Sequence, residues 1–213
     1  MRVAVLVSGR GTNLMALSAA IESGAVPATI ALVAADRPAP AAAWARGRGL
    51  DVFERPARAA GMADWEAAFL AEAQHRDVEA LVLAGFLRIL SPQVVARYRE
   101  RILNVHPSLL PAFPGLDAIG QALEHGVRVT GVTVHLVDEG LDAGPIVLQE
   151  AVAVAPGEER ASLEPRIHDV EHRLLPAALR LMCEGRLRVL GRRVTILDPE
   201  RLGEPTTQGQ EVL

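Results

Sequence analysis

Four short apolar runs, each bounded by turn residues, are the feature that most limits how this chain can fold. They span residues 2–8, 28–35, 78–83 and 101–105. Amphipathic, alanine-rich stretches separate them, and residues 12–22 and 64–76 have the periodicity of helices. Strands that are apolar throughout and alternate with helices are typical of a parallel sheet covered on both faces. The sequence therefore predicts a three-layer α/β fold with helices on both faces of the sheet.

The spacing of the elements changes after residue 115. We expect a helix near 117–125, two antiparallel strands over 127–137 and 146–154, a helix over 163–183 and a hairpin over 186–196. Residues 51–53 can add a short edge strand. The antiparallel pair makes the sheet mixed, though still mainly parallel. We expect one domain over residues 1–197 and a polar, mobile tail over 198–213.

The composition argues against several classes of function. A chain of 213 residues with a formal net charge of −4 lacks the basic stripe that nucleic-acid binding usually needs. All 22 basic residues are arginine, so neither a Schiff-base lysine nor a phosphate-loop lysine is available. Cys183 is the only cysteine, which rules out a disulfide within the chain and favours a reduced, cytoplasmic setting. The apolar run at residues 2–8 is too short to span a membrane.

Polar side chains with catalytic potential follow the predicted strand at 101–105. Asn104, His106 and Ser108 alternate along an extended segment. Prolines at positions 107, 111 and 114 prevent a helical continuation, so the polar groups lie on rigid loop backbone. An amide donor two residues from an imidazole is the pairing that acyl transfer needs for oxyanion stabilisation and proton transfer. A proline-rich structural loop is the alternative.

The glycine-rich turn at residues 8–13, between the first strand and the first helix, predicts an anion site. Exposed backbone amides and the helix dipole can hold a phosphate there. Leu14 stands where the dinucleotide fingerprint requires its third glycine, so a phosphate monoester fits better than NAD or ATP. Alternatively, Thr12 or Asn13 caps the helix. Asp36, at the end of the second strand, can bind the ribose of a dinucleotide or cap a turn.

The acidic, glycine-containing loop at residues 138–144 supplies three carboxylates. Its spacing misses the calcium-loop pattern, so a metal site is the weaker interpretation. One carboxylate is better used beside His106, where its negative charge favours the imidazolium ion and fixes the ring. His135, on the preceding strand, can enter the same pocket. His168 and His172 lie one helical turn apart without the zincin spacing, which favours a helix face that contacts a ligand or solvent over a zinc site.

Four segments carry a resemblance to a known family. They are Ser-Gly-x-Gly-x-Asn at residues 8–13, Leu-Ala-Gly-Phe-Leu-Arg-Ile-Leu at 83–90, Asn-x-His-Pro-Ser-Leu-Leu-Pro at 104–111 and Leu-Asp-x-Gly-Pro at 141–145. In this order and spacing they closely resemble the phosphoribosylglycinamide formyltransferases. The resemblance implies a Rossmann-like fold. It also implies transfer of the formyl group of 10-formyltetrahydrofolate to the amine of glycinamide ribonucleotide, in purine biosynthesis and without a metal.

The resemblance also implies roles for the matching residues. Asn104, His106 and Asp142 would form the catalytic group, while Ser108 would position other groups rather than attack. Glycinamide ribonucleotide would be held by Gly11, Thr12, Asn13, Pro107 and Glu171, the last of these on the ribose. The folate would be held by Leu87, Arg88, Ile89, Leu90, Asn104, Asp138, Gly140 and Asp142. The expected partners are these small molecules, with neither nucleic acid nor membrane, and the expected assembly is a monomer or weak homodimer.

The sequence departs from the family pattern at one contact. Some bacterial members have an arginine near residues 64–66 that touches the folate tail, and this chain offers Arg55 or Arg58 instead. Two related enzymes, methionyl-tRNA formyltransferase and formyltetrahydrofolate hydrolase, carry an additional domain that is not expected in 213 residues. A non-catalytic dinucleotide-binding module, using the glycine turn and Asp36, is the alternative from another class.

Overall fold

A computed structural model describes residues 1–199 of the chain. Its strands are β1 (Arg2–Val7), β2 (Thr29–Ala35), β3 (Val52–Glu54), β4 (Ala80–Leu83), β5 (Ile102–His106), β6 (Val129–Leu136), β7 (Ile146–Ala153), β8 (Leu187–Leu190) and β9 (Arg193–Ile196). Within these residues they form one sheet in the order β3-β2-β1-β4-β5-β6-β7-β9-β8. β1 to β5 are parallel, whereas β6 runs antiparallel to β5 and β7. The predicted mixed, mainly parallel sheet is confirmed.

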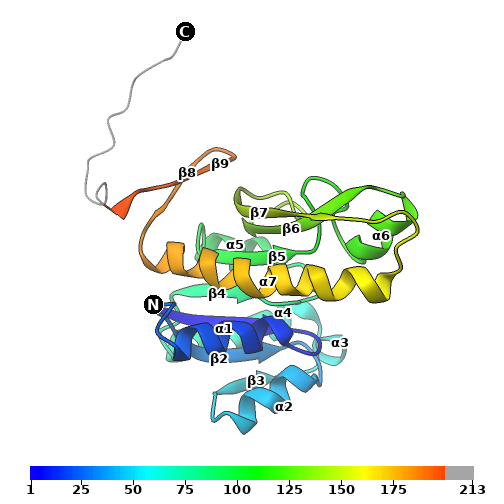
Figure 1. Ribbon diagram of the computed structural model, residues 1–213. Coiled ribbons are helices and arrows are strands. Elements are labelled where there is room, and N and C mark those ends of the chain that lie inside the picture. The colour runs from blue at the N-terminus through cyan, green and yellow to red at the C-terminus, as the bar shows by residue number, and fades with distance from the viewer. Residues whose placement is uncertain (200–213) are drawn as a thin grey trace.

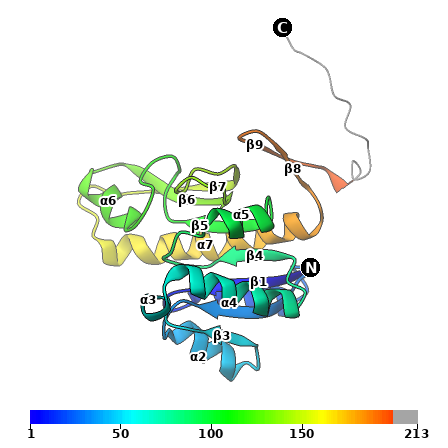
Figure 2. The same ribbon diagram turned by 180° about the vertical axis from the view of Figure 1, so that it is seen from behind.

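Helices cover both faces of the sheet, as Figures 1 and 2 show from opposite sides. They are α1 (Thr12–Glu22), α2 (Pro40–Gly47), α3 (Ala57–Ala60), α4 (Met62–His75), α5 (Pro92–Arg97), α6 (Ala118–Glu124) and α7 (Arg160–Cys183). α1, α2 and α7 pack on one face, and α4 and α5 pack on the other. This three-layer arrangement confirms the predicted fold class.

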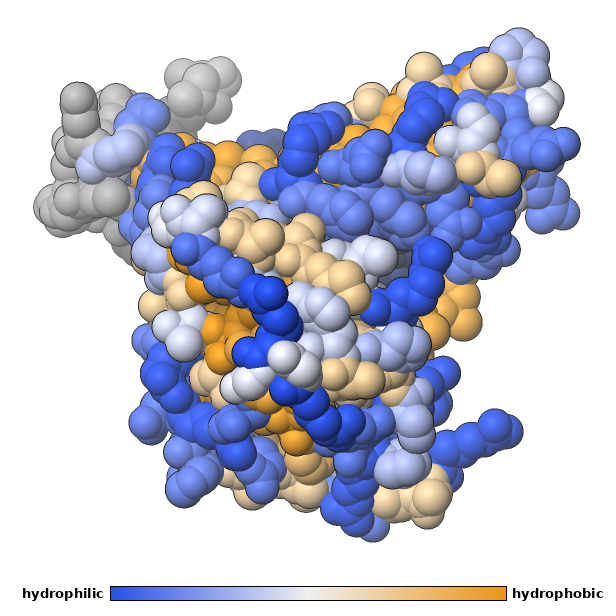
Figure 3. Space-filling view, turned by 60° about the horizontal axis from the view of Figure 1, so that its bottom comes forward, coloured by the Kyte–Doolittle hydropathy of each residue, from blue (hydrophilic) through white to orange (hydrophobic). Residues whose placement is uncertain are grey.

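The core lies on both sides of the central strands. Along β1, Val3, Val5 and Val7 point into the layer of α1 and α7, while Ala4 and Leu6 point into the layer of α4. All five side chains are fully buried, which is why this strand reads as a continuous apolar run. By contrast, hydrophilic side chains predominate on the outer face drawn in Figure 3, with smaller apolar patches between them.

Aromatic side chains gather on the α4 face. Trp65 and Phe69 stack with ring centroids 5.3 Å apart, and Phe86 lies 5.6 Å from Trp65. The indole N–H of Trp65 donates to the carbonyl of Ala35 at 3.3 Å, so the buried polar atom is satisfied. Because Phe86 belongs to the loop after β4, this packing also holds the start of that loop.

Most predicted elements agree with the observed ones to within a few residues, including the edge strand β3 and the hairpin β8–β9. Three short helices, α2, α3 and α5, are not singled out by the sequence analysis, because four to eight residues are too few to show a helical period. α7 begins earlier than predicted and continues through Pro165 and Pro176. Residues 200–213 of the predicted tail lie outside the described part of the chain. Within residues 1–199, no helix is both long and apolar enough to cross a membrane.

The topology brings several loops to one edge of the sheet. The carboxyl ends of β1, β4 and β5 are neighbours because these strands are adjacent and parallel. The glycine turn at 8–13, the loop at 84–90 and the proline-rich loop at 107–117 follow these three strands. Ligands of open α/β sheets bind at this edge. The fold therefore places the three loops around one site.

Candidate active site

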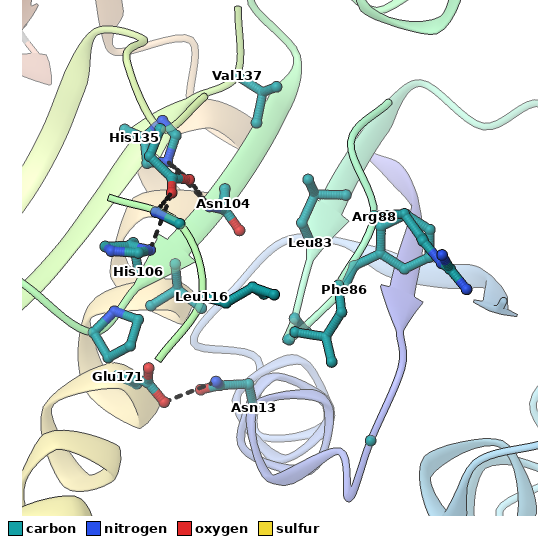
Figure 4. A pocket seen from close by; sticks show the side chains of 18 of the residues that line it. Asn13, Leu83, Phe86, Arg88, Asn104, His106, Leu116, His135, Val137 and Glu171 are labelled. Atoms are coloured by element: carbon teal, nitrogen blue, oxygen red, sulfur yellow. Dashed lines mark hydrogen bonds and ion pairs between the residues drawn. The ribbon is translucent and has the colours of Figure 1, made fainter. Parts of the chain in front are cut away.

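A cavity of about 540 Å³ opens at the carboxyl edge of the sheet. Its walls come from the glycine turn, the loop after β4, the end of β5, the loop after β6 and α7 (Figure 4). The sequence-predicted site residues that line it are Gly11, Thr12, Asn13, Leu87, Arg88, Ile89, Leu90, Asn104, His106, Pro107, Asp138, Gly140, Asp142 and Glu171. Segments that are far apart in the chain are thus brought together at the predicted place.

His106 ends β5 and is almost fully buried against the cavity wall. Its Nε2 atom donates a hydrogen bond to the carbonyl of Phe113 at 2.8 Å. Its Nδ1 atom lies 3.5 Å from the Oδ2 atom of Asp142. This distance is longer than that of a good hydrogen bond but lies within the range of an ion pair. The ring is therefore oriented by its contact with Phe113 and has a carboxylate beside its other nitrogen.

Asp142 is the acidic-loop residue that reaches the histidine. Its Oδ2 atom accepts the amide of Gly115 at 2.7 Å, and its Oδ1 atom accepts the side-chain amide of Asn104 at 3.3 Å. Burial would raise the pKa of this carboxyl group, but the contacts with His135 and Gly115 and the charge of His106 outweigh it and lower the pKa below its usual value. Asp142 is therefore a carboxylate at neutral pH.

Asn104 and His135 face each other across β5 and β6. The Nδ1 atom of His135 donates to the carbonyl of Leu136 at 3.0 Å, which fixes the ring orientation. Its Nε2 atom lies 3.1 Å from the Nδ2 group of Asn104. His135 also comes within 3.7 Å of Asp142. His135, which the sequence analysis could only suggest as a pocket residue, is thus part of the polar network.

The glycine turn has the geometry of an anion site. Gly11 adopts a left-handed conformation with φ 83°, and α1 begins directly after it. No side chain caps this start of α1 in the described structure, so the alternative in which Thr12 or Asn13 caps the helix is wrong. A Cβ atom on Gly11 would lie 2.5 Å from the Cβ atom of Ala41, so α2 also requires glycine here.

Asn13 and Glu171 connect the glycine turn to α7. The Nδ2 group of Asn13 donates to Oε2 of Glu171 at 3.0 Å, as Figure 4 shows. The Nδ1 atom of His168 donates to the same oxygen at 2.9 Å. This hydrogen bond is the main reason why the pKa of His168 is raised, against the opposing effect of burial. Glu171 therefore organises this wall of the cavity.

Two histidines lie side by side on α7. The rings of His168 and His172 stack with centroids 6.1 Å apart. Burial lowers the pKa of His172, whereas that of His168 is raised. Residues 1–199 contain no group of three or more histidine, cysteine or acidic side chains that could hold a metal ion. His168 lines the cavity, so the structure favours the ligand-facing interpretation of this helix face.

Four other candidates lie away from the cavity. Asp36 is buried against Ser8, Arg37 and Arg88 and cannot present its carboxylate to the ribose of a dinucleotide. Ser108 is fully buried and donates to the carbonyl of Ala112, which agrees with a positioning role. Neither Arg55 nor Arg58 lines the cavity, whereas an arginine of the loop after β4 does. The dinucleotide interpretation is therefore wrong for Asp36.

Comparisons with known proteins agree with this site. The model of the formyl transferase family matches residues 1–179. Phosphoribosylglycinamide formyltransferase of Mycobacterium tuberculosis is 42% identical over 207 residues, which cover 92% of this chain and 94% of that protein. The crystal structure of glycinamide ribonucleotide transformylase 1 from Symbiobacterium toebii superposes with a TM-score of 0.89 and 46% identity, covering 93% of this chain and 94% of the other.

A different enzyme of the same fold gives a less complete match. The structure of a formyltetrahydrofolate deformylase from Pseudomonas syringae superposes with a TM-score of 0.86 at 28% identity, but only 66% of that chain is covered. The relatives matched over nearly their whole length are phosphoribosylglycinamide formyltransferases. On this evidence the chain belongs to the formyl transferase family.

Proposed function

We propose that this chain transfers the formyl group of 10-formyltetrahydrofolate to the amine of glycinamide ribonucleotide, a step of purine biosynthesis. The observation that carries the proposal is the meeting of Asn104, His106 and Asp142 at one wall of the cavity. An amide donor, an imidazole and a charged carboxylate at one place are suited to a reaction that develops an oxyanion and moves a proton. The names of the relatives matched over nearly their whole length supply the acceptor and the transferred group, and the family resemblance supplies the folate donor.

The ribonucleotide lies between α1 and α7. Its phosphate sits on the amides of Gly11, Thr12 and Asn13, where the positive end of the α1 dipole favours an anion. Both contacts of Glu171 with neighbouring side chains use Oε2, so Oε1 is the oxygen for the ribose hydroxyls. Pro107 borders the path from the ribose to the amine. This orientation directs the amine towards His106.

The folate occupies the other part of the cavity. Leu87, Arg88, Ile89 and Leu90 form one wall, and Asp138, Gly140 and Asp142 form the opposite wall, next to Asn104. The side chains of Leu87 and Ile89 are exposed without ligand, as are those of Leu116 and Leu141. Exposed apolar side chains around a cavity favour a flat apolar ring system as ligand. The formyl group then lies between the two substrate pockets.

The chemistry is a direct attack. The amine nitrogen forms a bond to the formyl carbon, and the carbonyl electrons move to oxygen, where Asn104 and protonated His106 stabilise the negative charge. The bond from carbon to N10 of the folate then breaks as N10 takes a proton, and the attacking amine loses one. His106 transfers this proton through Nδ1, the atom that faces Asp142. No covalent enzyme intermediate forms, which fits the buried position of Ser108.

Asp142 keeps His106 ready for this role. Its charge lies close enough to favour the imidazolium form, and the amide of Gly115 donates to the oxygen that faces the ring and fixes its position. A water molecule beside the two groups can carry the proton from the amine to N10. Asp142 thus acts through the histidine and through solvent rather than by attacking the substrate.

The remaining parts of the proposal concern the setting. One domain over residues 1–197 performs the reaction as a monomer or weak homodimer in the cytoplasm, without nucleic acid. The acidic net charge and the single cysteine support this setting. Sedimentation at assay concentration tests the assembly.

The test of the function is a formyl-transfer assay with both substrates. We expect formylglycinamide ribonucleotide and tetrahydrofolate to form in equal amounts. Release of formate without glycinamide ribonucleotide would instead indicate a deformylase. The matched control is Glu139→Gln, because Glu139 is an exposed acid of the loop that carries Asp142. Absence of transfer by the unmodified protein would contradict the proposed function.

A further inference from the structure

A fully buried carboxylate lies beside the cavity without belonging to its catalytic group. Asp36 follows directly after β2, and its side chain has 0% exposed surface. A buried charge is costly unless hydrogen bonds and opposite charges compensate for it. The partners of Asp36 therefore indicate what the residue does.

The partners come from two loops of the cavity. The hydroxyl of Ser8 donates to Oδ1 of Asp36 at 2.7 Å, and Nε of Arg88 donates to Oδ2 at 2.8 Å. Arg37 adds a third donor, with Nη2 at 2.8 Å from Oδ2. The hydroxyl of Ser8 in turn accepts the amide of Leu87 at 2.9 Å. Asp36 thus joins the glycine turn to the backbone of the loop after β4.

The other end of that loop is held in the same way. Glu66 of α4 is buried, and its Oε1 atom accepts the amide of Ser91 at 2.8 Å. The loop at 84–90 is therefore held at its middle, at Leu87 and Arg88, by Asp36 and its partner Ser8, and just after its end by Glu66. Rigid support of this kind reduces the ordering that a ligand must impose when it binds.

The charges around Asp36 leave a cation at the rim of the cavity. Burial raises the pKa of Asp36, but the donors from Arg37, Ser8 and Arg88 outweigh burial and lower it, so the group is charged at neutral pH. One carboxylate between two guanidinium groups leaves a net positive charge. The side chain of Arg88 is 37% exposed and binds Asp36 through Nε, which leaves its terminal nitrogens for an outside anion.

The position of Arg88 limits which part of a substrate it can meet. In Figure 4 it lies across the pocket from Asn104 and His106. A substrate whose formyl group is at His106 therefore reaches Arg88 only with a remote part. The ribonucleotide is held on the side of Asn13 and Glu171, so the remote part belongs to the folate. The anionic end of a folate is its glutamate tail.

We infer that Asp36 is a positioning residue that fixes the loop after β4 and directs Arg88 to the carboxylates of the glutamate tail. This inference rests on the proposed function, because it takes the folate as ligand. It assigns the tail contact to Arg88, which lines the cavity, rather than to Arg55 or Arg58. Arg37 shares the charge of Asp36 with Arg88.

The test compares a folate with and without the tail. The Michaelis constants of 10-formyltetrahydrofolate and of 10-formyltetrahydropteroate, which lacks glutamate, are measured for the unmodified protein, Asp36→Asn, Arg88→Met and the double variant. We expect Asp36→Asn to raise the constant of the glutamate-bearing substrate by roughly tenfold, with a much smaller change for the pteroate. The effects of the two single variants should not add in the double variant, because both remove one interaction.

Controls separate this role from a merely structural one. Asp51→Asn removes an exposed acid that binds Arg76 far from the cavity, and it should leave the ratio of the two constants unchanged. If Asp36→Asn does not fold, Arg88→Met alone must abolish the advantage of the tail. An equal rise for both substrates, or a tail advantage that survives in Arg88→Met, would overturn the inference.

A binding measurement keeps this result apart from the proposed function. Calorimetric titration with 5,8-dideazafolate, which carries no formyl group to transfer, with and without its glutamate, reports the tail contact when no transfer takes place. If no transfer occurs but Asp36→Asn still weakens binding of the glutamate-bearing ligand, only the proposed reaction is contradicted. If transfer is normal and Asp36→Asn leaves the binding of both ligands unchanged, only the inference about Asp36 is contradicted.

Discussion

The carboxylate of Asp142 and the imidazole of His106 face each other, with 3.5 Å between Oδ2 and Nδ1. His106 ends β5 and Asp142 lies in the loop between β6 and β7, where the amide of Gly115 donates to the same Oδ2 atom. Because the pKa of Asp142 is lowered, the negative charge beside the ring persists into the acid range. The imidazole therefore has a charged carboxylate as its neighbour at neutral pH.

Asp142→Asn tests this pairing. The neutral amide no longer favours a charged ring, so we expect turnover to fall and the alkaline limb of the pH profile of kcat to move to lower pH. The measurement is kcat between pH 5 and pH 10 for both proteins, with Glu139→Gln as control. An unchanged alkaline limb, together with a lower melting temperature, would indicate a purely structural aspartate.

His106→Ala and Asn104→Ala test the catalytic group itself. Loss of the histidine should reduce kcat by roughly 10²–10⁴-fold, as for a removed general acid or base. Loss of the asparagine should reduce it by about 10²–10³-fold, as for a removed oxyanion donor. Steady-state kinetics with circular dichroism as a folding control provides the measurement. Turnover near the original value in a folded His106→Ala protein would refute its role.

Gly11→Ala tests the glycine turn. Alanine is strained in the left-handed backbone conformation of this position. Its Cβ atom would also lie 2.5 Å from the Cβ atom of Ala41 in α2, so the turn must shift. We expect the Michaelis constant of glycinamide ribonucleotide to rise more than that of the folate. Gly24→Ala is the matched control, because its φ of 78° is similar but its Cβ meets no atom within 4 Å. Equal effects on both substrates would argue against a phosphate site at this turn.

The pH dependence of stability tests the contact between His168 and Glu171. The pKa of His168 is raised above its usual 6.5, so the folded state holds the proton more tightly than the unfolded state. This stabilisation is fully present below about pH 6.5 and is lost as the pH rises through the raised pKa. Glu164 supports the charged ring and Arg10 opposes it.

The melting temperatures of the unmodified protein and of His168→Gln provide the measurement. Their difference should be large at pH 6 and should shrink towards pH 9. His172→Gln is the contrasting control, because burial lowers the pKa of His172 and reverses the sign. A difference that stays constant over this range would show that the ion pair does not contribute.

The sequence predicts the central sheet well and the small helices poorly. The strands on both sides of β1 are buried on two faces, so their apolar runs are continuous and easily recognised. α5 depends instead on a cap by Ser91 and on the packing of Val94 and Val95. A helix of six residues is too short for its sequence to show a helical period. Local periodicity carries no information about such tertiary support.

The same distinction applies to the site. Asn104 and His106 are visible in the sequence because they stand together on one strand, and the family resemblance adds Asp142. Spacing alone cannot show that Asp142 reaches His106. The distance between the two side chains depends on how β5 pairs with β6, whose following loop carries Asp142. The role of Asp36 is hidden for the same reason, because its partner Arg88 is 52 positions away. The sequence could only suggest a ribose contact or a turn cap for it.

The most direct test of the central claim is a single-turnover reaction with 10-formyltetrahydrofolate labelled in the formyl carbon, mixed with glycinamide ribonucleotide and an excess of protein. We expect the label to move completely into formylglycinamide ribonucleotide, and His106→Ala to slow this transfer by roughly 10²–10⁴-fold. Label that is released as formate, or that remains on the folate with the unmodified protein, would contradict the proposed transfer.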